Sequence, residues 1–196
     1  MRASLGDIFA DIRALADASG TLSSTGGLGP WLSKQLGEFR ALPGTLSQIV
    51  AQARAVRQVL APSGVSSALD SVNDAEAIAS GAQAEYPAVA QNVNGLMVAL
   101  VPVMPKINAG QYDADVISTL LRSGVDIVGT IHRVNDLLAK RDDARNALQS
   151  AVMNPTVPEN VRGDALSALS TSGSMGIVKV LVVLGIGYVI VNKVIK

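Results

Sequence analysis

The sequence predicts an all-α protein: a multi-helix bundle with one long helix and a hydrophobic, membrane-type helix at the C-terminus. Three observations favour this class. Apolar residues recur every three or four positions along most of the chain, as on one face of a helix. Hydrophobic residues make up 48% of the sequence but aromatic residues only 3%, so the apolar side chains are mainly Ala, Val, Leu and Ile. Prolines and glycines divide the apolar pattern into separate segments.

The first half of the chain is expected to form a series of short and medium helices. Apolar residues at helical spacing predict helices at residues 5–16, from 31 up to the Pro43–Gly44 pair, 45–60, 66–86 and 87–101. Residues 20–30 are rich in Gly, Ser and Thr and predict a connector. Pro43 and Pro87 are expected to separate helices, because proline lacks the N–H that an internal helical position donates.

The longest helix is expected at residues 113–151, where the apolar spacing continues without a proline. At about 1.5 Å per residue such a helix would be roughly 55 Å long and would form the spine of a bundle. A proline-marked linker and a short amphipathic helix at residues 159–171 follow it. The predicted organisation is therefore a bundle at residues 1–151, a linker with a short helix at 152–174, and a hydrophobic helix at 175–196.

The C-terminal segment is the most apolar part of the chain. No charged side chain occurs from Val180 to Val191, and lysines stand on both sides. The predicted membrane or interface residues are Ile177, Val178, Val180, Leu181, Val182, Val183, Leu184, Ile186, Val189, Ile190 and Val191, flanked by Lys179, Lys193 and Lys196. Burying one Val, Leu or Ile side chain is worth roughly 1.5–3 kcal/mol, so we expect lipid or protein to cover this segment.

The length of this segment is compatible with burial either in a lipid bilayer or in protein. A membrane-spanning helix needs roughly 17–25 mostly apolar residues. The charge-free core reaches roughly 18 Å as a helix, and about 25 Å if residues 176–192 are counted. Lys179 would then extend its charged end toward the lipid headgroups. The segment is therefore expected either to insert into a bilayer or to be buried in a multi-subunit assembly, where its Val and Ile content also allows a buried strand.

Few residues could carry catalysis or hold a metal ion. The chain has no cysteine and one histidine, His132, whose nearest carboxylate at helical spacing is Asp136. Such a pair is ordinary on a helix surface. The glycines at 26–29 lack the Gly-Lys-Ser/Thr ending of a phosphate-binding loop, and the mixed charges at 140–145 predict an ion-paired surface. We therefore expect a protein that is not an enzyme and binds no cofactor or metal.

Charge indicates which partners to expect. The 16 basic and 16 acidic residues balance, which argues against nucleic-acid binding, since nucleic-acid-binding proteins normally present a basic surface. The distribution is uneven: residues 61–115 hold one lysine and six acidic residues, whereas residues 175–196 hold three lysines and no acidic residue. Homo-oligomers, other structural proteins and a lipid bilayer are the expected partners. Asp7 and Asp11 occupy the place of a signal peptide's apolar region, so no cleavable signal is expected.

In composition and layout the chain resembles the internal virion proteins of bacteriophages, of the pilot or DNA-ejection type. It shares with them an Ala/Gly/Val-rich, aromatic-poor helical sequence without cysteine and with a hydrophobic terminal helix. The resemblance implies a virion or membrane-associated structural protein that oligomerises through amphipathic helices and aids genome delivery. Two alternatives stay open: a cellular helical adaptor with a C-terminal membrane anchor, and a pore-forming protein.

Overall fold

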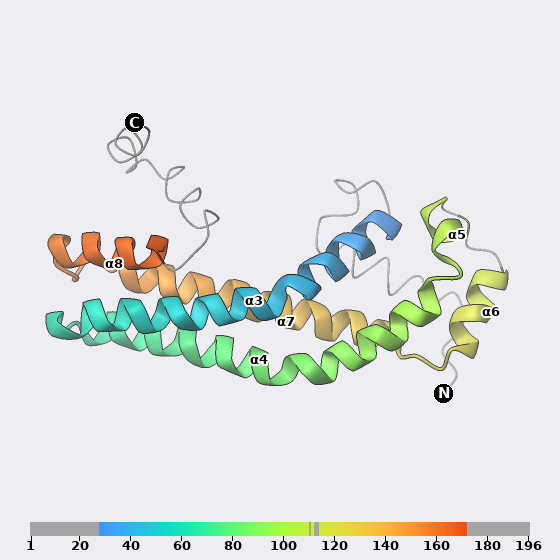
Figure 1. The fold of residues 1–196 in the computed structure, drawn as a ribbon, viewed down its shortest axis with the longest axis horizontal. Helices are drawn as coiled ribbons and strands as arrows, with labels where there is room; N and C mark the ends of the chain where they lie inside the picture. The colour runs from blue at the N-terminus through green and yellow to red at the C-terminus, as the bar shows by residue number, and fades with distance from the viewer. Residues whose placement is uncertain (1–27, 110, 112–113, 172–196) are drawn as a thin grey trace. The chain divides into compact units, whose positions relative to one another are not determined.

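The computed structural model describes residues 28–109, 111 and 114–171, and all regular structure in these residues is helical (Figure 1). The elements are α3 (Leu28–Leu60), the 3-10 turn η1 (Ala61–Ser63), α4 (Ser66–Leu100), α5 (Met104–Asn108), α6 (Ala114–Arg122), α7 (Ile127–Val152) and α8 (Glu159–Thr171). The predicted all-α class is therefore confirmed for the described residues. The helices predicted at residues 5–16 and 175–196 lie outside them.

Helix α3 runs without interruption through the Pro43–Gly44 pair, so the helix break predicted there is wrong. Buried side chains continue at helical spacing across the pair, with Phe39 and Leu42 before it and Leu46 after it. An internal proline costs a helix roughly 3 kcal/mol, whereas each such buried side chain is worth roughly 1.5–3 kcal/mol. The continuous buried face therefore outweighs the cost of one proline.

Helix α4 likewise continues through Pro87, and the prediction of a new helix starting there is wrong. The buried face of α4 extends on both sides of Pro87, through Ala82 before it and Val89 after it. The ring of Tyr86 also stacks on that of Phe39 in α3, with the ring centroids 4.7 Å apart. Aromatic pairs of this kind add about 0.5–1.5 kcal/mol beyond their buried area, and this pair holds α4 against α3 at the proline.

The long helix predicted at residues 113–151 is wrong, because the structure has two helices, α6 and α7, in its place. The connection contains Gly124 with a φ of +64°, a left-handed conformation that glycine adopts at little cost. Asp126 then caps the N-terminal end of α7: its Oδ1 accepts the backbone N–H of Gly129 at 2.9 Å. Arg133 donates to the other carboxylate oxygen at 3.2 Å. The turn and the cap together start a new helix at Ile127.

The chain divides into two compact units, and each is described separately. The first unit comprises Met1–Pro43 and Ala82–Lys140. Within its described residues, one buried apolar cluster joins side chains from all five helices of the unit, α3 to α7. The cluster consists of Leu32, Leu96, Ala99, Leu100, Val103, Ile107, Val116, Ile127 and Ile131.

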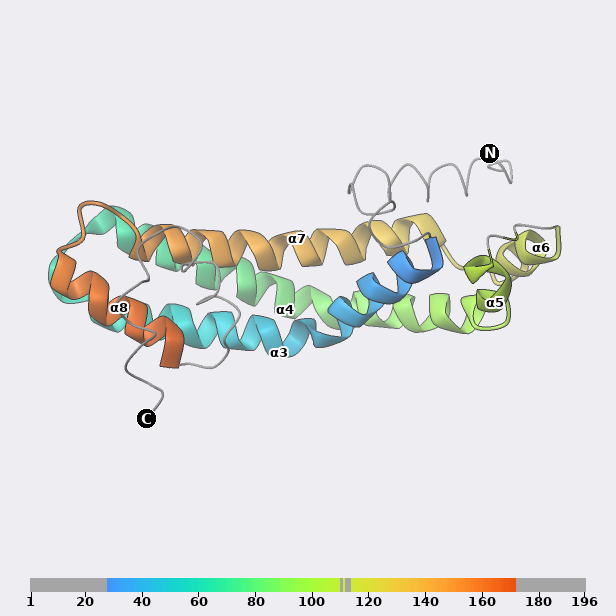
Figure 2. The ribbon, with the colours of Figure 1, turned by 90° about the horizontal axis from the view of Figure 1, so that it is seen from above.

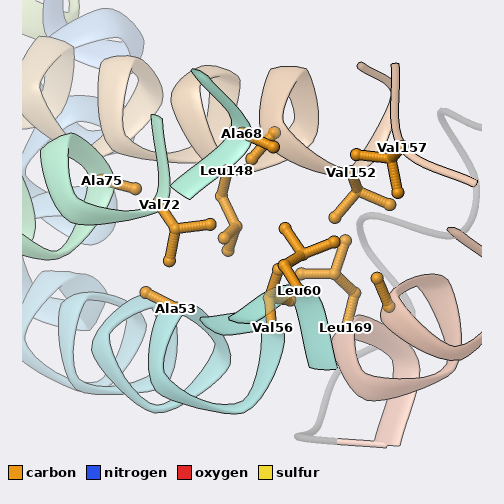
Figure 3. Close-up of a cluster of buried hydrophobic side chains, with 12 residues drawn as sticks. Ala53, Val56, Leu60, Ala68, Val72, Ala75, Leu148, Val152, Val157 and Leu169 are labelled. Atoms are coloured by element: carbon orange, nitrogen blue, oxygen red, sulfur yellow. The ribbon is translucent and has the colours of Figure 1, made fainter. Parts of the chain in front are cut away.

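The second unit comprises Gly44–Gly81 and Arg141–Lys196. Its described residues include a buried cluster formed by α3, α4, α7 and α8 together with the turn that precedes α8 (Figure 3). The cluster consists of Ala53, Val56, Leu60, Ala68, Val72, Ala75, Leu148, Ala151, Val152, Val157, Ala165 and Leu169. The many alanines leave little side-chain volume between the helices, so the helix backbones can pack closely.

Helix α8 closes the second unit, and its observed bounds, Glu159–Thr171, confirm the helix predicted at residues 159–171. Both ribbon views show α8 alongside the C-terminal part of α3 (Figures 1 and 2). Ala165 and Leu169 place the buried face of α8 in the core of this unit. The division of the chain at residues 151 and 174 stays a prediction.

Candidate functional site

All of the predicted membrane or interface residues follow Thr171 and lie outside the described residues. The structure therefore does not place Ile177 to Val191, nor Lys179, Lys193 and Lys196. Over residues 28–109, 111 and 114–171, no helix combines the length and hydropathy needed to cross a membrane. The structure does describe the helix that precedes the C-terminal segment in the chain, α8.

The last turn of α8 is fixed to α3 by a buried hydrogen bond. Gln52 of α3 is only 1% exposed, and its Nε2 donates to the backbone oxygen of Leu169 at 2.9 Å. Carbonyls in the last turn of a helix have no partner within that helix, and a buried carbonyl without a partner is costly. Gln52 therefore satisfies the end of α8 and joins it to a helix more than a hundred residues earlier.

We expect Gln52→Ala to destabilise the protein by about 1–3 kcal/mol, because it leaves the Leu169 carbonyl buried without a donor. The free energy of unfolding in urea, followed by far-UV circular dichroism in mild detergent, measures this loss. Gln58→Ala is the matched control, since Gln58 is exposed on the same helix and its replacement should change stability by less than about 0.5 kcal/mol. Equal effects of the two variants would contradict the assigned role of Gln52.

The connection between α7 and α8 is held by side-chain hydrogen bonds. Asn154 Oδ1 accepts the backbone N–H of Thr156 at 3.0 Å, and Asn154 Nδ2 donates to Ser67 Oγ of α4 at 3.1 Å. Arg162 of α8 donates to the carbonyl of Val157 at 3.0 Å, and the Val157 side chain is buried in the core. The segment predicted as a proline-marked linker thus has a defined path that fixes the start of α8.

An ion-pair group between α3 and α4 lies in the same unit. Arg54 Nε and Glu76 Oε1 are 2.8 Å apart, and Arg57 Nη2 contacts the other carboxylate oxygen, Oε2. The hydrogen bond from Arg54 lowers the pKa of the Glu76 carboxyl below its usual value, and Arg57 acts in the same direction, while partial burial opposes both. Helical spacing in the sequence does not reveal this group, because Glu76 lies 19 and 22 residues from its arginines in the chain.

Glu76→Gln should lower the stability of the protein at about pH 7 by up to about 1 kcal/mol, the range of partly exposed ion pairs. A carboxyl whose pKa is lowered on folding stabilises the native state above its unfolded pKa, about 4.3 for glutamate. This stabilisation is lost as the pH falls through the lower pKa of the folded state. The difference between wild type and variant in urea unfolding should therefore shrink toward zero in acid.

The control for this measurement is Asp74→Asn, which removes an exposed carboxylate from the same helix. We expect this variant to have a smaller effect at neutral pH. A stability difference between wild type and Glu76→Gln that did not change from about pH 7 to well below pH 4.3 would contradict the ion-pair assignment.

The single histidine lies near the start of α7. His132 and Asp136 are both exposed on α7. Nowhere in the described part of the chain do three or more His, Cys, Asp or Glu side chains form a group that could hold a metal ion.

The charged run that follows on α7 forms ion pairs, as predicted. In the first unit, Lys140 Nζ lies 2.5 Å from Glu85 Oε1 of α4. In the second unit, Arg141 Nε and Arg145 Nη1 lie 2.8 and 3.7 Å from Asp142 Oδ1. The predicted ion-paired surface is therefore confirmed, and one of its pairs also links α7 to α4.

The C-terminal end of α4 carries an apolar patch. Val98 is 77% exposed, and Val101, just after the helix, is 62% exposed. They lie within residues 86–105, the longest stretch of the sequence without a charged side chain. The sequence predicts a helix at residues 87–101. Leu96 and Leu100 in this stretch are buried, whereas Val98 and Val101 are exposed.

No protein-family model, curated protein or solved structure matches the chain. The function is therefore inferred from the residues of the chain themselves.

Proposed function

We propose that this is a non-enzymatic structural protein whose C-terminal segment, residues 177–191, inserts into a lipid bilayer or is buried between the subunits of an assembly. The observation that carries the proposal is the charge-free run from Val180 to Val191, bounded by Lys179 and Lys193. Each aliphatic side chain left in water forfeits roughly 1.5–3 kcal/mol. A bilayer or a dry protein interface removes this cost for the whole segment.

The buried polar groups of the helical part support a scaffold role. Among the described residues, the buried polar side chains are Gln52 and Thr130. Gln52 donates to the Leu169 carbonyl, and Thr130 Oγ1 donates to the Asp126 carbonyl at 2.6 Å. Gln52 thus satisfies a carbonyl at the end of α8, whereas the Thr130 hydroxyl donates to a carbonyl that already accepts the Thr130 backbone N–H, so the bond satisfies the buried hydroxyl itself. In this proposal, the helices of residues 28–171 support the C-terminal segment.

The segment favours assembly as well as burial. It is short for a bilayer span, and a short span can be accommodated by thinning of the bilayer or by oligomerisation. Gly185 and Gly187 would allow neighbouring helices to approach closely. The three lysines of residues 175–196 are opposite in charge to the acidic excess of residues 61–115. Copies of the chain therefore have both an apolar and an electrostatic reason to associate.

The resemblance to bacteriophage internal virion proteins supplies the biological setting of the proposal. In that setting, several copies assemble in the virion through amphipathic helices. Their C-terminal segments then meet a membrane or neighbouring subunits and aid delivery of the genome.

The test uses the purified 196-residue chain. We expect it to float with phospholipid vesicles in a density gradient and to have a mass in detergent that is a multiple of the chain mass. An oligomer that does not float would support burial between subunits. A monomer that does not float would overturn the proposal, and release of a dye from the vesicles would favour the pore-forming alternative.

A further inference from the structure

We draw no further inference here: the strongest candidate, the surface patch formed by Val98 and Val101 at the C-terminal end of α4, is an unpartnered apolar face, and nothing in the structure shows what covers it.

Discussion

Leu184→Arg is expected to weaken binding of the 196-residue chain to lipid vesicles by roughly 60- to 300-fold. Leu184 lies at the middle of the charge-free run, and a charged side chain at the centre of an inserted helix costs about 2.5–3.5 kcal/mol. Every 1.4 kcal/mol corresponds to about a tenfold change in an equilibrium constant. Vesicle flotation over a range of lipid concentrations measures the change. If the segment is instead buried between subunits, the same substitution should lower the oligomeric mass in detergent.

Two further variants make this result specific to the segment. Asn94→Arg adds the same charge at an exposed position of α4, and it should leave both flotation and mass unchanged. Truncation after Ser174 removes the segment altogether and should abolish flotation. The described core ends at Leu169, so the truncated protein should keep a helical circular dichroism spectrum. If the truncated protein floated as well as the untruncated chain, the segment would have no part in membrane binding.

Leu148→Ala is expected to destabilise the protein by about 2–5 kcal/mol, the range for truncating a fully buried leucine. Leu148 is 1% exposed, and its side chain lies among those of Val72 of α4 and Leu60 of α3 (Figure 3). Removing it leaves a cavity that three helices line and cannot easily fill. Since the stability of a typical domain is about 5–15 kcal/mol, this loss is a large share of the total.

The measurement is the free energy of unfolding in urea, with Val98→Ala as the control. Val98 is 77% exposed, so removing its two methyl groups should change stability by less than about 0.5 kcal/mol. A Leu148 variant no less stable than the Val98 variant would mean that the second unit does not pack around Leu148.

The helical class follows from apolar spacing. The helix boundaries depend in addition on the balance between local backbone geometry and the burial of apolar side chains, which spacing alone does not decide. Pro43 and Pro87 predict breaks from local geometry, and the buried faces of α3 and α4 override both. The reverse happens between α6 and α7. The apolar spacing continues across residues 123–126, yet Gly124 and the Asp126 cap end one helix and start another. Among the helices in the described residues, α8, which has prolines just before it, is the one that has both bounds as the sequence predicts.

The contacts that fix the second unit could not be predicted in the same way. Helical spacing relates residues three or four positions apart. Glu76 meets its arginines across 19 and 22 positions, and Gln52 meets Leu169 across 117. Such pairs are set by the packing of helices and leave no periodic pattern in the chain. The C-terminal segment, in contrast, can be recognised from its amino-acid composition alone, because it is apolar and without charge from Val180 to Val191.

The hydrogen bond from Gln52 to Leu169 also has a mechanical consequence. Any pull that a bilayer or a neighbouring subunit exerts on the C-terminus enters the described part of the molecule at Thr171, two residues after Leu169. Leu169 is held to α3 twice, by its side chain in the cluster with Leu60 and by its carbonyl on Gln52. Tension on the C-terminus is therefore shared with α3 through a bond shielded from water, and does not rest on the covalent chain of α8 and α7 alone.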